Sequence, residues 1–475
     1  MRADLVAWVA ELRPADFVIP ALMVLFISFG GSGSQGYGAH ALFFLLCGVM
    51  SAVCIVSTPI SELPVRMRPL LVFWGACIVI ACLQLIELPR ALWQLLGDRA
   101  LLNEGWAIVQ QDPNFVPTSL APDRTIRAML YFLIPVALIL AAMKVGWRAT
   151  TAYLPWTIAI LGTASVFLGF LQILLPEVTQ LYPFIFSTPN APVGLFSNIN
   201  NQASFVLMCL PFTALLLTRY MAKRRRSDLE NGVMILIGML LAIQLLGVLA
   251  AGSVAGYLIL VPVLVLCILL SRRKRQAVDL RLILAAALVL VPAILLVAHS
   301  PLLSGLGVTS VTNDGPTSRL GIAEVAIRIF WDHPILGTGL GTFEPVFKIY
   351  EDPDSVSLGY VNQAHNDYLQ WGIETGLIGL IVVMGFLIWS LSQTIRVWRI
   401  EGDRTARLRR AAATAALVPM LHSFVEYPLR NPAILSLACL AVVLLVLPEN
   451  RSQRAASKEK EDGDEREPDG RRLNL

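Results

Sequence analysis

Long runs of apolar residues recur along almost the whole chain, separated by short polar segments. Most runs reach roughly 18 residues, the length that an α-helix needs to cross a bilayer. Within lipid the backbone must satisfy its own hydrogen bonds, as a helix does. The pattern predicts an all-α polytopic membrane helical bundle of about twelve transmembrane helices. The predicted spans are 17–31, 41–58, 69–88, 126–144, 154–176, 201–218, 233–249, 254–270, 281–298, 367–393, 411–428 and 431–447.

Composition agrees with this pattern. Of the 475 residues, 56% are hydrophobic and 15% are charged, whereas an average soluble protein has about 25% charged residues. Too few charged side chains remain to cover a water-facing surface of this size. The seven cysteines lack Cys-x-x-Cys spacing, and most lie within apolar runs. We therefore expect them to be packing residues, and we expect neither a metal nor a cofactor.

Lys and Arg side chains are concentrated in every second connection between the spans. Segments 219–226, 272–275 and 396–410 are rich in them, whereas 32–40 and 250–253 carry none. Because positively charged loops stay on the cytoplasmic side, both termini are predicted to be cytoplasmic. This topology accounts for the basic loops, so they indicate no nucleic-acid partner.

The predicted orientation places two longer connections outside, 89–124 and 299–366. In the second, acidic residues outnumber basic ones, and residues 319–331 have the apolar spacing of a helix. We expect residues 1–447 to form one transmembrane helical domain that includes the partly helical periplasmic loop 299–366. Residues 448–475 are charged and poor in apolar residues, so we expect a disordered cytoplasmic tail.

Two polar clusters lie at the outer ends of predicted spans. His365 lies where the long loop enters a span, and Glu374 follows on the same predicted helix. His422 and Glu426 are four residues apart, so they are expected to lie on one face of a helix. Arg430 follows in a short outer turn. Polar residues in membrane spans are costly and often functional.

These residue types suit one kind of chemistry. Histidine accepts a proton near neutral pH, and arginine holds a diphosphate by charge and paired hydrogen bonds. A base beside cations at a membrane surface suggests group transfer from a lipid-linked diphosphate. Structural roles remain open: His365 could cap a helix, and Arg319 could be a solvated loop arginine. His422 and Glu426 could form an interhelical hydrogen-bond pair.

At these residues the chain resembles the bacterial O-antigen ligase and O-antigen polymerase family. The motif His-Asn-Asp-Tyr-Leu at 365–369, followed by Glu-Thr-Gly-Leu-Ile-Gly at 374–379, is similar to the main motif of that family. The similarity extends over roughly residues 110–445. Further similar segments, in chain order, are 119–125, 194–201, 334–343 and 422–430.

The resemblance implies a multi-pass protein of the bacterial inner membrane. Its implied reaction moves a preassembled glycan from undecaprenyl diphosphate to a sugar hydroxyl at the periplasmic face, without a metal. The acceptor would be another glycan for a polymerase, which 422–430 favours, or a lipid A-core for a ligase. A chain-length regulator of polysaccharide assembly is a further implied partner. The implied residues are His365 as the catalytic base, Arg319, Arg430 and Arg127 as diphosphate contacts, and Glu374, His422, Glu426, Asn198 and Asn201 in support.

One position departs from the family pattern. Many members have an arginine after a serine at the outer start of a span, but here Ser253 is followed by Val254. One diphosphate contact would then be missing, and Arg127 or Arg430 could replace it. A transporter or flippase of lipid-linked glycans and a non-catalytic scaffold remain alternatives. A transporter is expected to place charged residues along a path near the bilayer midplane, whereas these polar clusters gather at one face.

Overall fold

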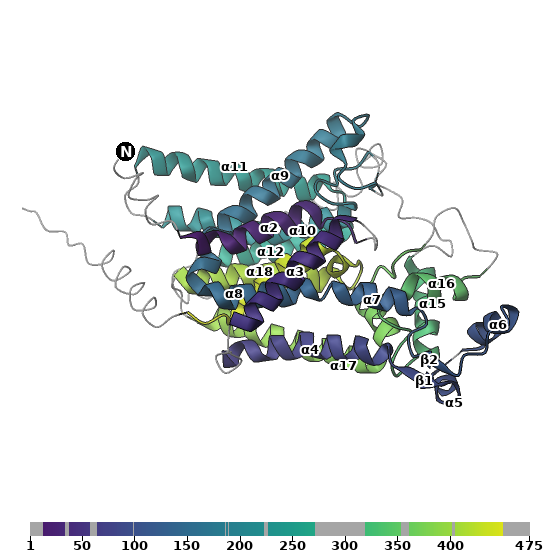
Figure 1. Cartoon of the computed structure of the whole chain (residues 1–475). Helices are drawn as coiled ribbons and strands as arrows, with labels where there is room; N and C mark the ends of the chain where they lie inside the picture. Colours follow the sequence, from purple (N-terminus) through teal and green to yellow (C-terminus); the bar gives the residue numbers. More distant parts are fainter. Residues whose placement is uncertain are drawn as a thin grey trace, which may run out of the picture.

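The computed structural model describes residues 13–33, 38–57, 64–97, 99–185, 187–188, 190–222, 227–270, 319–352, 361–400 and 404–449. These residues form a bundle of long helices that run side by side, with a group of shorter elements at one end (Figure 1). The bundle helices are α2 (Val18–Phe29), α3 (Gly38–Ser57), α4 (Arg68–Gln84), α7 (Pro122–Leu130), α8 (Leu133–Thr151), α9 (Leu154–Leu174), α10 (Ile199–Met221), α11 (Asp228–Ala250), α12 (Val254–Leu270), α17 (Asp367–Arg399), α18 (Arg404–His422) and α19 (Pro432–Val446).

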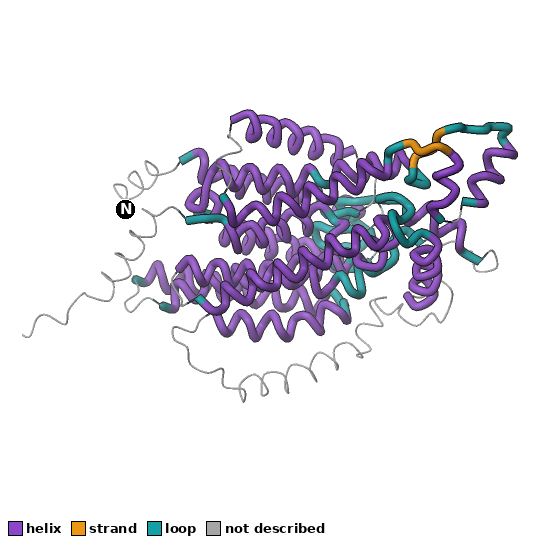
Figure 2. The backbone as a smooth tube through the Cα atoms, turned by 90° about the horizontal axis from the view of Figure 1, so that it is seen from below, coloured by secondary structure: helices purple, strands orange, loops and turns teal. Residues whose placement is uncertain are grey.

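The shorter elements and most loops gather at the same end of the bundle (Figure 2). The predicted helix at 319–331 is confirmed as α15. Strands β1 and β2 pair antiparallel, with Glu87 opposite Pro117. The predicted span 69–88 is therefore too long, because its helix ends at Gln84 and β1 begins at Glu87, and the sequence pattern predicts no strand in the connection that follows. The elements at this end are β1 (Glu87–Pro89), α5 (Arg90–Trp93), α6 (Ala100–Ile108), β2 (Phe115–Pro117), α15 (Arg319–Asp332), α16 (Phe343–Tyr350) and the 3-10 helices Gln94–Leu96, Thr179–Leu181 and Pro428–Arg430. Two further 3-10 helices, Pro14–Phe17 and Val65–Met67, directly precede α2 and α4.

The prediction of an all-α polytopic membrane protein is confirmed. Each predicted span except 281–298 coincides with a helix or a helix pair, and 281–298 lies outside the described residues. Among the described residues, α2, α12 and α19 are apolar but shorter helices, and twelve spans in total stays a prediction. Seven helices of the described part are long and apolar enough to cross a membrane: His40–Ser57, Val65–Gln84, Pro122–Thr151, Leu154–Leu174, Ile199–Met221, Asp228–Ala250 and Asp367–Arg399.

Helix α10 lies at the centre of the bundle. It packs against α9, α11, α12 and α18, while α19 packs against α2, α8 and α18. Most side chains of α10 and α19 are buried on every face, as expected for a helix surrounded by other helices. Five buried alanines between residues 411 and 416 of α18 have small side chains that allow close helix packing.

Helix α17 is interrupted at Gly376, where φ is 65°. The glycine-rich loop 334–341 lies against this break. A Cβ atom at Gly376 would collide with the carbonyl oxygen of Ile335, so glycine is required for both the backbone angle and the close approach. The amide of Leu377 donates to the carbonyl of Pro334 (2.8 Å), and the amide of Thr338 donates to that of Ile373 (2.9 Å). The break therefore fastens the loop to the first turns of α17.

Helix α18 ends earlier than the sequence predicts. The helix begins at Arg404 and ends at His422, whereas the predicted span extends to 428. The Ser423 hydroxyl donates to the buried Asp367 (2.9 Å), and Pro428 provides no amide proton to continue a helix. The expectation that His422 and Glu426 lie on one helix face is therefore wrong. Glu426 lies in the turn after α18, where its carboxylate contacts Arg319 and His365.

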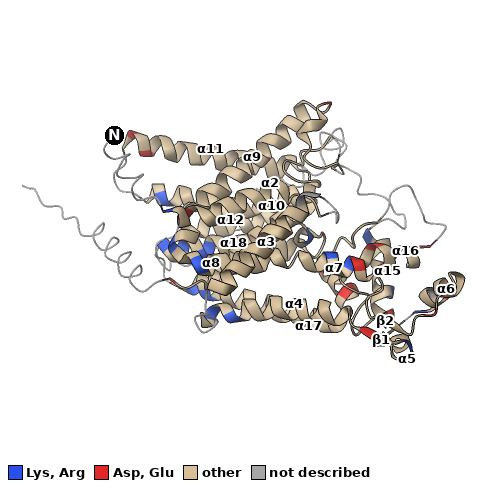
Figure 3. Ribbon diagram, viewed as in Figure 1, with Lys and Arg blue, Asp and Glu red and all other residues tan. Residues whose placement is uncertain are grey.

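Lys and Arg residues gather at the end of the bundle away from α15 and α16 (Figure 3). Lys144 and Arg148 near the end of α8 and Arg396 and Arg399 at the end of α17 belong to this group. The bundle thus has one end rich in basic residues and one end formed by loops and short helices, which we call the loop end.

Candidate functional site

Glu426 lies at the centre of a polar cluster at the loop end of the bundle. Its side chain is 3% exposed and forms an ion pair with Arg319, the first residue of α15. Asn200 in the first turn of α10 donates from Nδ2 to Oε1 of Glu426 (2.6 Å). Nδ1 of His365 lies 3.2 Å from the other oxygen, Oε2. One buried carboxylate thus joins residues that are far apart in the chain.

His365 occupies a constrained backbone position. Its φ angle is 49°, in the left-handed region that is uncommon for residues other than glycine. Asn366 follows and caps α17, because its side chain accepts from the amide of Leu369 (3.0 Å), while Nδ2 donates to the carbonyl of Phe424 (2.9 Å). These bonds hold His365 just before the N-terminus of α17, and 27% of the His365 side chain is exposed.

The contact with Glu426 favours one form of the imidazole. A carboxylate accepts hydrogen bonds, so Nδ1 of His365 carries the proton in the neutral ring and Nε2 keeps its lone pair. The ring also packs edge-on against Tyr427, with centroids 5.1 Å apart. Nε2 is therefore the nitrogen that is able to accept a proton from another molecule.

Tyr427 and Asn198 form the wall beside His365. The side chain of Asn198 accepts from the amide of Asn200 (2.7 Å), which caps α10, and it also bonds to the phenol of Tyr427. Burial, followed by the nearby charge of Glu426, raises the pKa of Tyr427 well above its ordinary value. Tyr427 therefore remains an uncharged phenol.

Two of the predicted supporting residues lie beside this cluster without touching Glu426 through their side chains. His422 is fully buried, and its Nδ1 lies 2.5 Å from Oγ of Ser204 in α10. Asn201 is 4% exposed in the first turn of α10. The site residue that sequence reasoning missed is Asn200. The segment 194–201 contains it, but spacing alone gives no sign of which asparagine faces Glu426.

A second cluster surrounds Arg430. Its Nη1 lies 2.9 Å from Oε2 of Glu374, and its Nε lies 3.6 Å from Oδ1 of Asp367. Glu374 is fully buried and also accepts from Gln370 (3.1 Å). The Glu374 carbonyl accepts from Gln84 of α4 (2.7 Å). Two buried carboxylates thus hold one arginine in a fixed position, with 17% of its side chain exposed.

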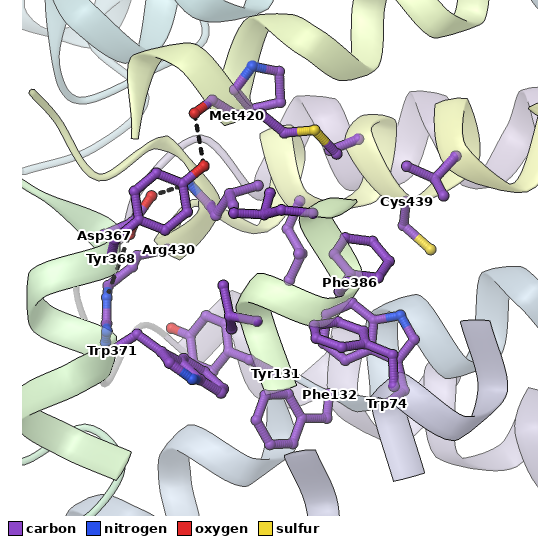
Figure 4. Close-up of a pocket in the computed structure, with 18 of the residues that line it drawn as sticks. Trp74, Tyr131, Phe132, Asp367, Tyr368, Trp371, Phe386, Met420, Arg430 and Cys439 are labelled. Carbon is purple, nitrogen blue, oxygen red and sulfur yellow. Dashed lines mark hydrogen bonds and ion pairs between the residues drawn. The ribbon is translucent and has the colours of Figure 1, made fainter. Parts of the chain in front are cut away.

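Arg430 and Asp367 line one end of a cavity of about 190 Å³ between α4, α7, α17, α18 and α19. Most of the other lining side chains are apolar, and many are aromatic. Tyr368 lies near the polar end and donates to the carbonyl of Met420 (2.7 Å). Figure 4 shows Phe386 and Trp74 on the other side of the cavity. The cavity is thus an apolar space with an ion pair of Arg430 and Asp367 at one end.

Arg127 is brought into neither cluster. It lies on α7 with 58% of its side chain exposed, and its ion-pair partner is Asp123 on the same helix (3.9 Å). Val254 begins α12 and is exposed. The preceding Ser253 is 2% exposed and accepts from the amide of Gly256 (3.1 Å). The position where many family members have an arginine thus carries no charge here.

The arrangement provides a base, a carboxylate that orients it, and two arginines. Across the described ranges, no group of three or more His, Cys, Asp or Glu side chains could hold a metal ion. The chemistry of these side chains is that of proton transfer beside an anion.

Residues 237–384 match the family model described as O-Antigen ligase. The matched segment contains Arg319, His365 and Glu374, and it ends before Glu426 and Arg430. No curated protein matches the chain. The family match confirms the resemblance predicted from the motifs.

Proposed function

We propose that this protein, which carries a domain of the O-antigen ligase family, transfers a preassembled glycan from undecaprenyl diphosphate to a sugar hydroxyl. The bond between the acceptor oxygen and the anomeric carbon forms, and the bond between that carbon and the diphosphate breaks. The proton leaves the acceptor hydroxyl, and the diphosphate departs as an anion. No redox step or further reactant is needed for this balance.

His365 is proposed to take the proton from the acceptor hydroxyl through Nε2. The observation that carries the proposal is the contact between Nδ1 of His365 and Oε2 of Glu426 (3.2 Å). Glu426 orients the ring and stabilises the imidazolium that forms when the proton arrives. The same Glu426 is anchored by Asn200 (2.6 Å), so the base is held before substrate binds.

Arg319 is proposed to contact the diphosphate. Negative charge builds on the leaving diphosphate as the bond breaks, and a fixed cation lowers the energy of that state. Arg319 has 52% of its side chain exposed and lies at the same carboxylate as His365. The base and the cation thus lie on the two sides of one small site.

The undecaprenyl chain is proposed to enter the cavity between α4, α17 and α19. Its walls are apolar, and Arg430 at one end provides a positive charge next to which a phosphate could lie. Arg430 is thereby a second candidate contact for the diphosphate. Arg127 stays a weaker one, because its ion-pair partner is Asp123 of the same helix and it belongs to neither polar cluster.

The loop end is proposed to face the periplasm across the bacterial inner membrane. The basic residues gather at the opposite end (Figure 3), and basic loops favour the cytoplasmic side. The site then opens where lipid-linked glycans are joined rather than where nucleotide sugars are made. A polymerase acceptor would be a second glycan, and a ligase acceptor would be a lipid A-core.

A strain that lacks the gene tests this function and separates the two acceptors. Lipopolysaccharide reduced to bare core, with lipid-linked polymer accumulating, indicates a ligase. Accumulation of single lipid-linked repeat units indicates a polymerase. Movement of labelled donor between the leaflets of a reconstituted liposome, without new glycosidic bonds, would support a transporter and contradict the transferase proposal.

A further inference from the structure

One buried carboxylate is shared by two cationic partners. Arg319 pairs with Oε1 of Glu426, and Nδ1 of His365 lies 3.2 Å from Oε2. A carboxylate carries a single negative charge, so an arginine that pairs with it weakens the attraction that it exerts on a protonated imidazole. In this arrangement Arg319 holds part of the charge that would otherwise favour proton uptake by His365.

The partners of Glu426 differ in how readily they can move. The side chain of Glu426 is 3% exposed, that of His365 is 27% exposed, and that of Arg319 is 52% exposed. The segment that follows His365 is tied to the turn after α18, since the amide of Asp367 donates to the carbonyl of Ser423 (2.9 Å). Arg319 is therefore the partner that can leave with the least disturbance.

Asn200 lowers the free-energy cost to Glu426 of losing Arg319. Its Nδ2 donates to the same oxygen, Oε1, that Arg319 pairs with (2.6 Å). When Arg319 leaves, Oε1 keeps a neutral hydrogen bond and does not become an unsatisfied buried atom. Among the described residues, His365 is then the ion-pair partner that remains to Glu426.

We propose that Arg319 restrains His365 until the donor binds. The diphosphate draws Arg319 away from Glu426, and the charge of Glu426 then strengthens His365 as a base. This inference rests on the proposed function, because it takes a polyprenyl diphosphate as the ligand of Arg319. It makes the two substrates ordered: the acceptor hydroxyl is activated only after the donor is in place.

Among the residues that the structure describes, the other groups that face His365 do not duplicate this effect. Tyr427 is uncharged, since burial raises the pKa of its phenol. Asp367, which follows on the same segment, is paired with Arg430 of the turn after α18 (3.6 Å). His422 of α18 is fully buried, with Nδ1 bonded to Ser204 (2.5 Å). The pair of Arg319 and Glu426 is the contact that a bound anion can change.

The test measures how easily His365 takes up a proton, through its carbethoxylation by diethyl pyrocarbonate at a series of pH values. The reagent attacks the neutral imidazole, and peptide mass spectrometry separates His365 from the other histidines. In ligand-free protein, Arg319→Met is expected to raise the pH midpoint of the modification at His365, because the carboxylate of Glu426 is then no longer shared with an arginine. The matched control is Arg328→Met, which removes an exposed arginine from the same helix and is expected to leave the midpoint unchanged.

A second arm adds undecaprenyl diphosphate without a glycan, so that no transfer takes place. The lipid is expected to raise the midpoint in the wild-type protein and to raise it much less in Arg319→Met. Arg319→Lys keeps the positive charge, so its ligand-free midpoint is expected to stay near the wild-type value. If Arg319→Met does not fold, Arg319→Lys still tests whether the positive charge at this position sets the midpoint.

Two results would overturn the inference. One is a ligand-free midpoint of Arg319→Met that equals the wild-type value, or a midpoint of Arg319→Lys that rises as far as that of Arg319→Met. The other is an equal rise with undecaprenyl diphosphate in the wild type and in Arg319→Met. Glycan transfer by the wild-type protein is assayed separately. If the wild-type protein transfers glycan but the midpoint shifts at His365 are absent, the proposed restraint is wrong and the proposed function stands. If the ligand-free shift is present but the wild-type protein transfers no glycan, the proposed function is wrong.

Discussion

Oε2 of Glu426 lies 3.2 Å from Nδ1 of His365, although the two residues belong to separate segments at the ends of α18 and α17. Glu426→Gln keeps the shape of the side chain and removes its charge. It is expected to lower kcat by about 100-fold or more, the usual contribution of an assisted general base. Glycan transfer by purified protein measures this. The control Asn200→Ala removes a neutral bond to the same carboxylate, and a loss in it that equals that of Glu426→Gln would contradict the role of the charge.

Arg430 and Arg319 are expected to differ in what they contribute to stability. Arg430 is 17% exposed and pairs with the buried Glu374 and Asp367, so Arg430→Met leaves two carboxylates unpaired. Removing one partner of a buried ion pair costs about 3–5 kcal/mol. Arg319 is 52% exposed, and Glu426 keeps the bond from Asn200 and the contact with His365 when Arg319 is removed, so the cost there is smaller. Thermal unfolding in detergent is expected to show a large decrease in Tm for Arg430→Met and a small one for Arg319→Met. Equal decreases would contradict this difference.

The break in α17 at Gly376 is expected to be intolerant of a side chain. Gly376→Ala places a Cβ atom against the carbonyl of Ile335 at a φ of 65°, which costs on the order of 1–3 kcal/mol. Gly385 lies on the same helix, and a Cβ atom there meets no atom within 4 Å. Gly385→Ala is therefore expected to be neutral or stabilising by about 0.5–1 kcal/mol. Tm values in the opposite order would contradict the packing described for loop 334–341.

The cavity is expected to select for the lipid chain of the donor. Val383 lines it, whereas the next residue on α17, Met384, is exposed on the helix surface. Val383→Trp fills the cavity and is expected to raise the donor KM by roughly tenfold, a change of about 1.4 kcal/mol in binding free energy, because the lipid chain loses the space that it is proposed to enter. Met384→Trp is the matched control and is expected to leave KM unchanged. A normal KM for Val383→Trp would show that the chain lies elsewhere.

The bundle follows from local sequence, whereas the contacts of the site do not. Apolar runs report helices directly, and residues 319–332 form the helix that their spacing indicates. The end of α18 depends on how Ser423 pairs with Asp367 in another segment, which no local pattern reveals. Glu426 therefore does not lie on the helix face that the sequence predicts for it. The strand pair near Glu87 is three residues long on each side, too short for an alternating pattern to be detected.

The sequence also indicated which residues lie near one another, but not which of their side-chain atoms are in contact. Placing His365, Arg319 and Glu426 near one face required only the positions of the spans and the distribution of charge. That Arg319 and His365 contact opposite oxygens of Glu426 depends on side-chain directions in three separate segments. Asn200 was missed for the same reason, because its neighbours Asn198 and Asn201 have the same chemistry.

The most direct test of the proposed base is glycan transfer by purified His365→Ala protein, with a polyprenyl-diphosphate-linked glycan as donor. Gel filtration and Tm establish that the variant is folded, and binding of undecaprenyl diphosphate establishes that the donor site is intact. The account predicts unchanged donor binding and a loss of transfer of about 100-fold or more. Transfer at the wild-type rate by a folded His365→Ala protein would contradict it.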